Sequence, residues 1–139
     1  MEVIKRIGDD LPKYQTKDSA GLDLHSVEQV TLKPLERKLV DTGINVAIPQ
    51  GYEGQIRPRS GLSWKHGITV LNSPGTIDAD YRGPLRVMLV NLSGEEYTVN
   101  VYDRIAQLVI AAYAKVTIEE VDELSETKRG ALGFGSTGK

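Results

Sequence analysis

The sequence predicts an all-β fold: a sandwich, a jelly roll or a small barrel. Short runs of β-forming residues recur along almost the whole chain, and residues that favour turns separate them. Several runs alternate, so that Leu85–Leu89 and Tyr97–Val101 each place every second residue on one face. Only residues 61–66 have a helical pattern, enough for one or two turns. About ten short strands with one short helix are typical of these architectures.

The expected strands follow one another with turn residues between them. In chain order they are Val3–Arg6, Leu22–His25, Gln29–Leu32, Arg37–Asp41, Ile44–Ile48, Glu53–Pro58, Ile68–Leu71, Leu85–Asn91, Tyr97–Val101 and Ile105–Tyr113. Turn torsions are supplied at Gly43, Pro49–Gly51, Pro74–Gly75, Gly83–Pro84 and Ser93–Gly94.

Length and charge restrict the class of protein. The 139 residues suit a single domain, and we expect a β body over residues 1–124 followed by a mobile flap over 125–139. A net charge of −2 gives no basic surface for nucleic acid, so bound phosphate would need locally placed cations. With no Cys and two His, thiolate sites are excluded and a His-based zinc site is disfavoured. No apolar run approaches the ~20 residues of a membrane span, and the N-terminus lacks a signal-peptide pattern, so we expect a cytoplasmic protein with no membrane partner.

Polar clusters interrupt the strands at five places. In the first, Asp23 lies between apolar residues, where it needs a partner or a metal hydration shell, unless it faces solvent at a strand edge. In the second, Arg59 offers a planar donor fork for phosphate, and Ser60 with Gly61 opens the expected helix. An ordinary Ser N-cap is the alternative. Trp64 is expected to pack against the protein.

The third cluster, residues 72–83, favours a hairpin that exposes backbone N–H and C=O groups. Such groups, together with the Asn72 amide, can recognise the Watson–Crick edge of a pyrimidine. One carboxylate is enough to orient and deprotonate a water molecule, and Asp78 and Asp80 share one face if the segment is extended. Tyr81 can stack on a sugar and block a 2′-hydroxyl. A plain Asp-rich turn is the alternative.

The fourth cluster opens the most apolar strand, and the fifth is the tail. Asp103 and Arg104 are expected to form an exposed pair, whereas Gln107 should hydrogen-bond a specific partner. In the tail, residues 129–139, glycines allow backbone N–H groups to converge on an anion, and hydroxyls and cations flank them. Phe134, the single Phe, can stack on a base. A solvated terminus is the alternative.

These five clusters, in this order, resemble the five motifs of the homotrimeric dUTPases. The resemblance covers about residues 19–138 and is most specific at Pro58–Gly61, Ile77–Gly83 and Gly133–Gly138. It implies a jelly-roll-like homotrimer with active sites at the subunit interfaces, where each tail closes over a neighbour's site. The implied reaction is Mg²⁺-dependent hydrolysis of dUTP to dUMP and pyrophosphate. That reaction limits uracil incorporation into DNA and supplies dUMP for thymidylate synthesis.

The resemblance also implies residue roles. Asp78 would orient the water that attacks the α-phosphorus, Asp23 would hold Mg²⁺ through water, and Tyr81 would exclude ribose. Uracil recognition falls to Asn72 and to the hairpin backbone at Gly75 and Ile77. Phosphate binding and closure fall to Arg59, Ser60, Gly61, Gln107, Arg129, Gly135, Ser136, Thr137 and Gly138, with Phe134 stacked over uracil.

The sequence departs from the usual pattern of that family at three places. Leu132 stands where the tail usually has a glycine, Pro84 where a polar residue is more usual, and Ser63–Trp64 where two alanines are commoner. Two other functions are alternatives. A dCTP deaminase has a related fold but would need a Glu general base and a different tail. A non-catalytic nucleotide-binding β-sandwich is the other.

Overall fold

The computed structural model describes residues 1–5, 7 and 11–133. Within this part of the chain there are ten strands and one helix. They are β1 (Glu2–Lys5), β2 (Gly21–His25), β3 (Val30–Leu32), β4 (Arg37–Ala47), β5 (Tyr52–Arg57), α1 (Ser60–His66), β6 (Ile68–Val70), β7 (Gly75–Ile77), β8 (Pro84–Asn91), β9 (Tyr97–Val99) and β10 (Arg104–Ala112). The all-β prediction is confirmed.

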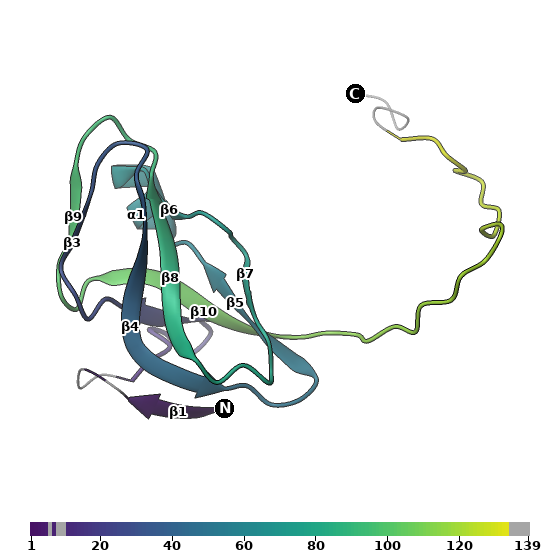
Figure 1. The fold of residues 1–139 in the computed structure, drawn as a ribbon, viewed down its shortest axis with the longest axis horizontal. Helices are drawn as coiled ribbons and strands as arrows, with labels where there is room; N and C mark the ends of the chain where they lie inside the picture. Colours follow the sequence, from purple (N-terminus) through teal and green to yellow (C-terminus); the bar gives the residue numbers. More distant parts are fainter. Residues whose placement is uncertain (6, 8–10, 134–139) are drawn as a thin grey trace.

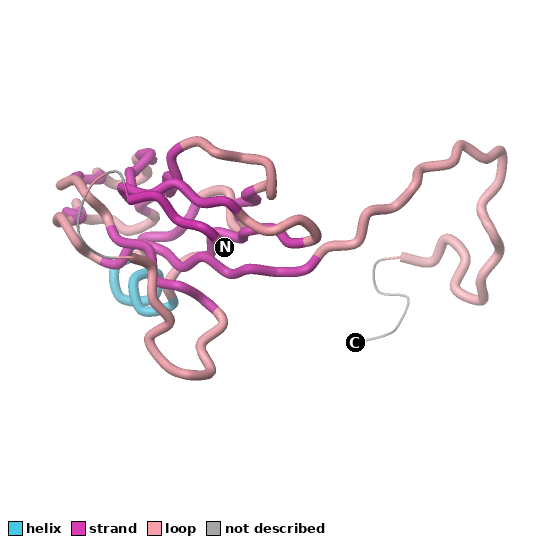
Figure 2. The backbone as a smooth tube through the Cα atoms, turned by 90° about the horizontal axis from the view of Figure 1, so that it is seen from below, coloured by secondary structure: helices cyan, strands magenta, loops and turns pink. Residues whose placement is uncertain are grey.

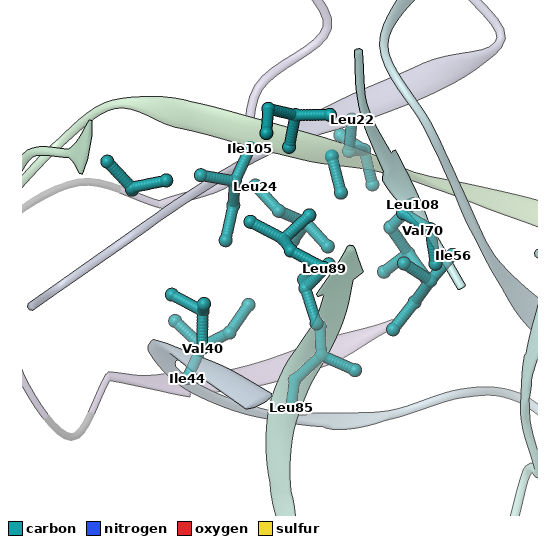
Figure 3. Close-up of a cluster of buried hydrophobic side chains, with 14 of the residues drawn as sticks. Leu22, Leu24, Val40, Ile44, Ile56, Val70, Leu85, Leu89, Ile105 and Leu108 are labelled. Atoms are coloured by element: carbon teal, nitrogen blue, oxygen red, sulfur yellow. The ribbon is translucent and has the colours of Figure 1, made fainter. Parts of the chain in front are cut away.

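Two four-stranded antiparallel sheets enclose the core (Figure 1). One sheet has the order β1-β4-β8-β6, the other β2-β10-β5-β7, and β3 pairs with β9 beside them. Buried side chains from both sheets form one cluster (Figure 3). It includes Leu22, Leu24, Val40, Ile44, Ile56, Val70, Leu85, Leu89, Ile105 and Leu108.

The alternating pattern of β8 explains how a strand contributes to this core. Leu85, Val87 and Leu89 are fully buried, whereas Arg86 between them is exposed. Burying one such aliphatic side chain contributes about 1.5–3 kcal/mol, so a strand with three buried residues is strongly held to one register.

Two strand boundaries differ from those expected. Arg37–Asp41 and Ile44–Ile48 were expected as separate strands, but β4 is continuous from Arg37 to Ala47, with an irregular register between Asp41 and Asn45. Gly43 therefore lies in a bulge inside the strand rather than in a turn, and its φ of 72° explains why glycine is needed there. The short strand β7 was not expected. The expected and observed numbers of strands agree at ten because two expected strands form β4 and β7 is added.

The helix α1 begins one residue earlier than expected and ends at His66, and the following Gly67, with a φ of 64°, makes a left-handed C-cap. Leu62 packs against the core, whereas Trp64 is 90% exposed. The expectation that Trp64 packs against the protein is therefore wrong for the chain by itself. A helix at the rim of the sheets contacts the core along one narrow stripe, and position 64 lies off that stripe.

Beyond Ala112 the chain leaves the body as an extended arm, residues 113–133, with no helix or strand (Figure 2). This departure comes earlier than the division at 124/125 suggested by the sequence. Val116 and Ile118 in the arm are 79% and 91% exposed, respectively. In the described part of the chain, no helix has the length and apolar character required to cross a membrane.

Candidate functional site

A buried carboxylate with two arginines is the first of two polar groups on the sheet β2-β10-β5-β7. Asp23, in β2, is a buried residue whose side chain is 10% exposed. Its Oδ1 lies 3.4 Å from Arg59 Nε, and its Oδ2 accepts a hydrogen bond from Arg104 Nη1 at 3.2 Å. Arg59 Nη1 also donates to the Arg104 carbonyl oxygen at 3.0 Å. The carboxylate therefore fixes two guanidinium groups in one place.

Two alternatives from the sequence are overturned by these contacts. Asp23 is not a solvent-facing strand-edge residue, because it is buried and contacts two cationic side chains. Asp103 and Arg104 do not form an exposed pair: Arg104 contacts Asp23, whereas Asp103 accepts a hydrogen bond from Asn100 N at 2.8 Å. Sequence reasoning missed Arg104 as a member of this group. Its position at the start of the strand that carries Gln107 was the available signal.

Gln107 joins the same group from β10. It lies opposite Asp23 on one side and Arg57 on the other, and its Nε2 donates to the Pro58 carbonyl oxygen at 2.9 Å. The expected specific hydrogen bond is thus present. Gly21 makes room for this side chain, since a Cβ at position 21 would overlap Gln107 Oε1.

The start of α1 adds a hydroxyl beside the arginines. Arg59, and not Ser60, occupies the N-cap, and no side chain caps the helix. The expected alternative of a Ser60 N-cap is therefore wrong, and Ser60 is exposed. Gly61 faces open space because, apart from its chain neighbours and the backbone of its own helix, no atom lies within 4 Å of where its Cβ would be. Packing against the body thus leaves room for a side chain there.

Tyr97, from β9, lies beside α1. Its ring centroid is 4.8 Å from that of His66, the last helical residue. Partial burial raises the pKa of the Tyr97 hydroxyl, the negative charge of Asp103 raises it further, and the positive charge of Arg59 opposes this rise. Burial and the charge of Asp103 thus favour the neutral form of the phenol beside Arg59.

The second polar group is the hairpin of residues 72–83. Within the described residues β7 pairs only with β5, so it forms an edge of its sheet and presents backbone groups outward. The Asn72 amide nitrogen lies 3.2 Å from the position a Cβ would have at Gly75. A side chain at 75 would crowd that amide, so glycine keeps Asn72 against the edge strand.

Asp78 follows β7 directly and is exposed. Its carbonyl oxygen accepts a hydrogen bond from Tyr81 N at 3.1 Å, so residues 78–81 form a turn. Asp78 and Asp80 were expected to share one face of an extended segment, and the turn replaces that geometry. Both still line the same open groove of about 1250 Å³, together with Arg82, Tyr113 and other residues.

Tyr81 is fixed by its neighbours. Its hydroxyl donates to the Pro84 carbonyl oxygen at 3.1 Å, and its ring fills the space where a side chain at position 83 would lie. Arg82 braces the same loop, because its Nη1 donates to the carbonyl oxygens of Ala79 and Tyr81 at 2.6 and 2.8 Å. The aromatic ring therefore has a defined place beside Asp78.

The two groups lie toward opposite ends of strand β5. Ile77 pairs with Gly54 near its start, whereas Gln107 pairs with Arg57 at its end. The six steps from position 53 to position 59, two residues past the end of β5, correspond to about 20 Å at 3.3 Å per residue if the chain stays extended. The structure thus assembles each group but does not bring the carboxylate of Asp78 to the guanidinium of Arg59 within one chain.

The beginning of the predicted flap is also described. Arg129 Nε donates to the Leu132 carbonyl oxygen at 2.9 Å, and Leu132 N donates back to the Arg129 carbonyl oxygen at 3.2 Å. A tight turn therefore links the two residues. The predicted contacts of Phe134, Gly135, Ser136, Thr137 and Gly138 lie outside the described residues.

Within the described chain, the Asp23 carboxylate is the candidate for metal binding. No cluster of three or more His, Cys, Asp or Glu residues occurs in that part of the chain. The Asp23 carboxylate offers about four acceptor positions, and the two arginines use two of them. The residues therefore suit a hydrated ion contacted through water better than a directly ligated one, because two cations already adjoin the carboxylate.

Together, the fold and these groups fit an all-β hydrolase of phosphorylated substrates. The dUTPase family model matches residues 9–138, and the chain belongs to this family. The resemblance deduced from the five clusters is therefore confirmed.

Similar proteins match this chain over nearly its whole length. The deoxyuridine 5′-triphosphate nucleotidohydrolases of Nautilia profundicola and Fusobacterium nucleatum are 59% and 55% identical to it, covering 98% and 100% of this chain and 97% of each relative. The dUTPase of Staphylococcus bacteriophage 80alpha with dUPNHPP has a TM-score of 0.92 at 30% identity, covering 99% of this chain and 98% of that one. This likeness confirms the jelly-roll-like fold.

Proposed function

We propose that this chain hydrolyses dUTP to dUMP and pyrophosphate, with Asp78 as the residue that orients the attacking water. The observation that carries the proposal is the Asp78–Pro84 loop: an exposed carboxylate next to an edge strand, with a fixed aromatic ring three residues away. A carboxylate can take a proton from water as it attacks phosphorus, and the ring gives the sugar a fixed contact surface.

Substrate recognition is proposed to divide between the two polar groups. The β7 edge at Gly75 and Ile77, with the Asn72 amide, suits the alternating donors and acceptors of uracil. The ring of Tyr81 is proposed to contact deoxyribose and to exclude a 2′-hydroxyl. Phosphate binding falls to Arg59, Ser60, Gly61 and Gln107. The ion pair with Asp23 holds the Arg59 fork before substrate arrives.

A homotrimer with active sites between subunits is part of the proposal. The separation of Asp78 from Arg59 along β5 supports it, because one nucleotide needs both groups at once. The arm supports it too, since Val116 and Ile118 expose apolar surface that a neighbouring subunit can cover. Cations pooled from several chains also explain how a chain of net charge −2 can bind a polyanion.

The flap, residues 125–139, is proposed to be mobile and to close over a neighbour's site. Arg129 would contact the outer phosphates, Phe134 would stack over uracil, and the remaining contacts come from Gly135, Ser136, Thr137 and Gly138. A closing flap excludes water and completes the donor set only when substrate is present.

Mg²⁺ is the proposed cofactor. A similar phage phi11 dUTPase, 29% identical with a TM-score of 0.83, is described as coordinating a structural Mg(II) ion. When bound, Mg²⁺ would neutralise phosphate charge, and it usually keeps several water ligands. Asp23 would then accept hydrogen bonds from those waters with the carboxylate positions that Arg59 and Arg104 leave open.

The proposal also includes the biological setting expected from the sequence. The reaction would limit uracil incorporation into DNA and supply dUMP for thymidylate synthesis, in the cytoplasm. Relatives at 52–59% identity all carry the dUTP nucleotidohydrolase name, which disfavours a dCTP deaminase.

Pyrophosphate release from dUTP, UTP, dTTP and dCTP, each with Mg²⁺, tests the function. We expect turnover of dUTP and at least about a hundredfold lower kcat/KM for UTP, because a ribose hydroxyl would collide with Tyr81. Equal rates on UTP and dUTP, or no turnover of any substrate, would contradict the proposal. Sedimentation of the same sample tests the trimer, and a monomer would contradict the shared site.

A further inference from the structure

We propose that Trp64 receives Leu132 from the flap of a second copy of this chain when nucleotide is bound. Trp64 is the single tryptophan of the sequence and is 90% exposed. A tryptophan can bury 150–250 Å², so its almost complete exposure leaves a large apolar surface without a partner. The proposal deepens the proposed function, since it rests on closure of the flap over the proposed phosphate-binding residues Arg59, Ser60 and Gly61.

The exposed indole lies on the same helix as Ser60 and Gly61, which are proposed to bind phosphate. Ser60 and Trp64 are four residues apart in α1, so their side chains lie on one face of the helix, about 6 Å apart. Gly61 and Lys65 are exposed beside them, whereas Leu62 turns toward the core. Whatever closes over Ser60 must therefore pass next to Trp64.

The glycine on this face indicates that something approaches it closely. A glycine inside a helix costs about 1 kcal/mol relative to alanine. At Gly61, apart from its chain neighbours and the backbone of its own helix, no atom lies within 4 Å of the missing Cβ, so packing against the body does not require glycine. A ligand or a second copy seated on the same face as Trp64 would gain close access to the backbone there.

Leu132 is the flap residue suited to the indole. It is 65% exposed, and the reciprocal hydrogen bonds with Arg129 hold it in the same turn. In such a turn the two Cα atoms lie within about 7 Å of each other. If Arg129 contacts a phosphate at Arg59 and Ser60, Leu132 is carried to the edge of that site, where Trp64 lies.

The second copy is favoured over the chain's own flap by the direction of the arm. The arm departs from the end of β10 that lies opposite the Arg104 end, so it begins far from α1 (Figure 1). Tyr113 N still donates to the Gly51 carbonyl oxygen at 3.1 Å, but Val116 and Ile118 are 79% and 91% exposed, so these residues do not pack on their own body. Leu132 of the arm and the indole of Trp64 are both exposed within one chain, so a second copy can bring them into contact.

Because the chain has one tryptophan, its fluorescence reports this contact without labelling. The protein is titrated with an α,β-imido analogue of dUTP and Mg²⁺, while calorimetry follows binding independently. We expect Trp64 emission to shift to shorter wavelength on binding. Leu132→Ala should abolish the shift and weaken binding about tenfold, equivalent to about 1.4 kcal/mol. Leu35→Ala, at an exposed leucine of the body, is the matched control and should change neither.

Mixed assemblies decide which chain supplies the leucine. Chains with Leu132→Ala are refolded together with chains carrying Trp64→Phe, so that every remaining tryptophan belongs to a chain without its own Leu132. Recovery of the emission shift supports contact between copies, and its absence overturns it. An unchanged emission despite calorimetric binding also overturns the proposal but leaves the function intact. Absence of calorimetric binding overturns both.

Discussion

The ring of Tyr81 lies against the backbone of Gly83, in the volume that any side chain at position 83 would fill. The hydrogen bond from its hydroxyl to the Pro84 carbonyl oxygen holds the other end of the ring. Glycine at 83 is therefore a requirement of the neighbouring aromatic residue and not of its own backbone torsion. The position of Tyr81, which is proposed to discriminate deoxyribose from ribose, depends on a residue that touches no substrate.

Gly83→Ala should consequently relax sugar discrimination. The new methyl group overlaps the Tyr81 ring, which must swing away from its place beside Asp78. We expect the ratio of kcat/KM for dUTP to that for UTP to fall at least about tenfold, equivalent to about 1.4 kcal/mol. Gly94→Ala is the matched control, because a Cβ there meets nothing within 4 Å. An unchanged ratio would show that Tyr81 does not depend on Gly83.

Asp78→Asn should abolish turnover and preserve binding. The amide keeps the shape of the side chain but cannot accept the proton of the attacking water, so kcat should fall by about 10²–10⁴-fold. Asp78 is exposed and its loop is held by backbone contacts, so the fold should be unaffected. Pyrophosphate release and calorimetric titration with the imido analogue measure the two properties. Turnover close to that of the parent would remove Asp78 as the water-orienting residue.

Asp23→Asn should weaken both the fold and phosphate binding. The variant leaves Arg59 and Arg104 beside each other without the carboxylate that separates them. Since both arginines are partly exposed, we expect a loss of about 1–2 kcal/mol in the free energy of unfolding, together with a higher KM for dUTP. Urea unfolding and initial rates measure these effects.

Arg86→Gln is the control for the Asp23 variant, because Arg86 lies in a more exposed ion pair with Asp41 at 3.9 Å. Its effect should be below about 0.5 kcal/mol. Equal losses in the two variants would mean that the Asp23 group has no special role.

Removal of residues 127–139 should separate folding from catalysis. The last strand ends at Ala112, and the described part of the removed segment contains no helix or strand. The shortened protein should therefore unfold at the same urea concentration and keep its oligomeric state, while kcat/KM for dUTP falls at least about a hundredfold. Unfolding or dissociation on truncation would instead assign the segment a structural role.

Stability should fall in alkaline solution because of Tyr97. Its raised pKa means that the unfolded chain loses the phenolic proton first, near the ordinary value of about 10. The contribution of the neutral phenol is complete below that pH and is lost as pH rises toward the folded-state pKa. Tyr97→Phe should reduce the slope of unfolding free energy above pH 10, measured against the parent protein. Identical slopes would refute this account.

The positions of the strands were largely predictable, because the alternation of apolar and polar residues along a strand follows the alternation of buried and exposed side chains. β8 and β10 lie where alternating and apolar runs placed them. β7 was missed because three residues next to Pro74 carry too little pattern, and it exists only because β5 offers a partner edge. Gly43 was misassigned for a related reason: a bulge and a turn both need positive φ, and tertiary pairing decides between them.

The site was predictable as a set of residues but not as a geometry. Asp23, Arg59 and Gln107 were identified from their chemistry, yet their convergence with Arg104 depends on the pairing of β10 with both β2 and β5. The exposure of Trp64 was unpredictable because an apolar residue in a short helix is ordinarily turned inward.

The placement of Asp78 and Arg59 toward opposite ends of β5 has a genetic consequence. If neighbouring chains each contribute one of these residues, two different inactive alleles can rescue one another. A mixture of equal amounts of Asp78→Asn and Arg59→Ala chains would contain intact sites wherever an unaltered Asp78 meets an unaltered Arg59, about a quarter of the total on random assembly. By the same arithmetic, equal amounts of Asp78→Asn and unaltered chains would keep about half of the sites, so a single defective allele would act as a simple loss of dose.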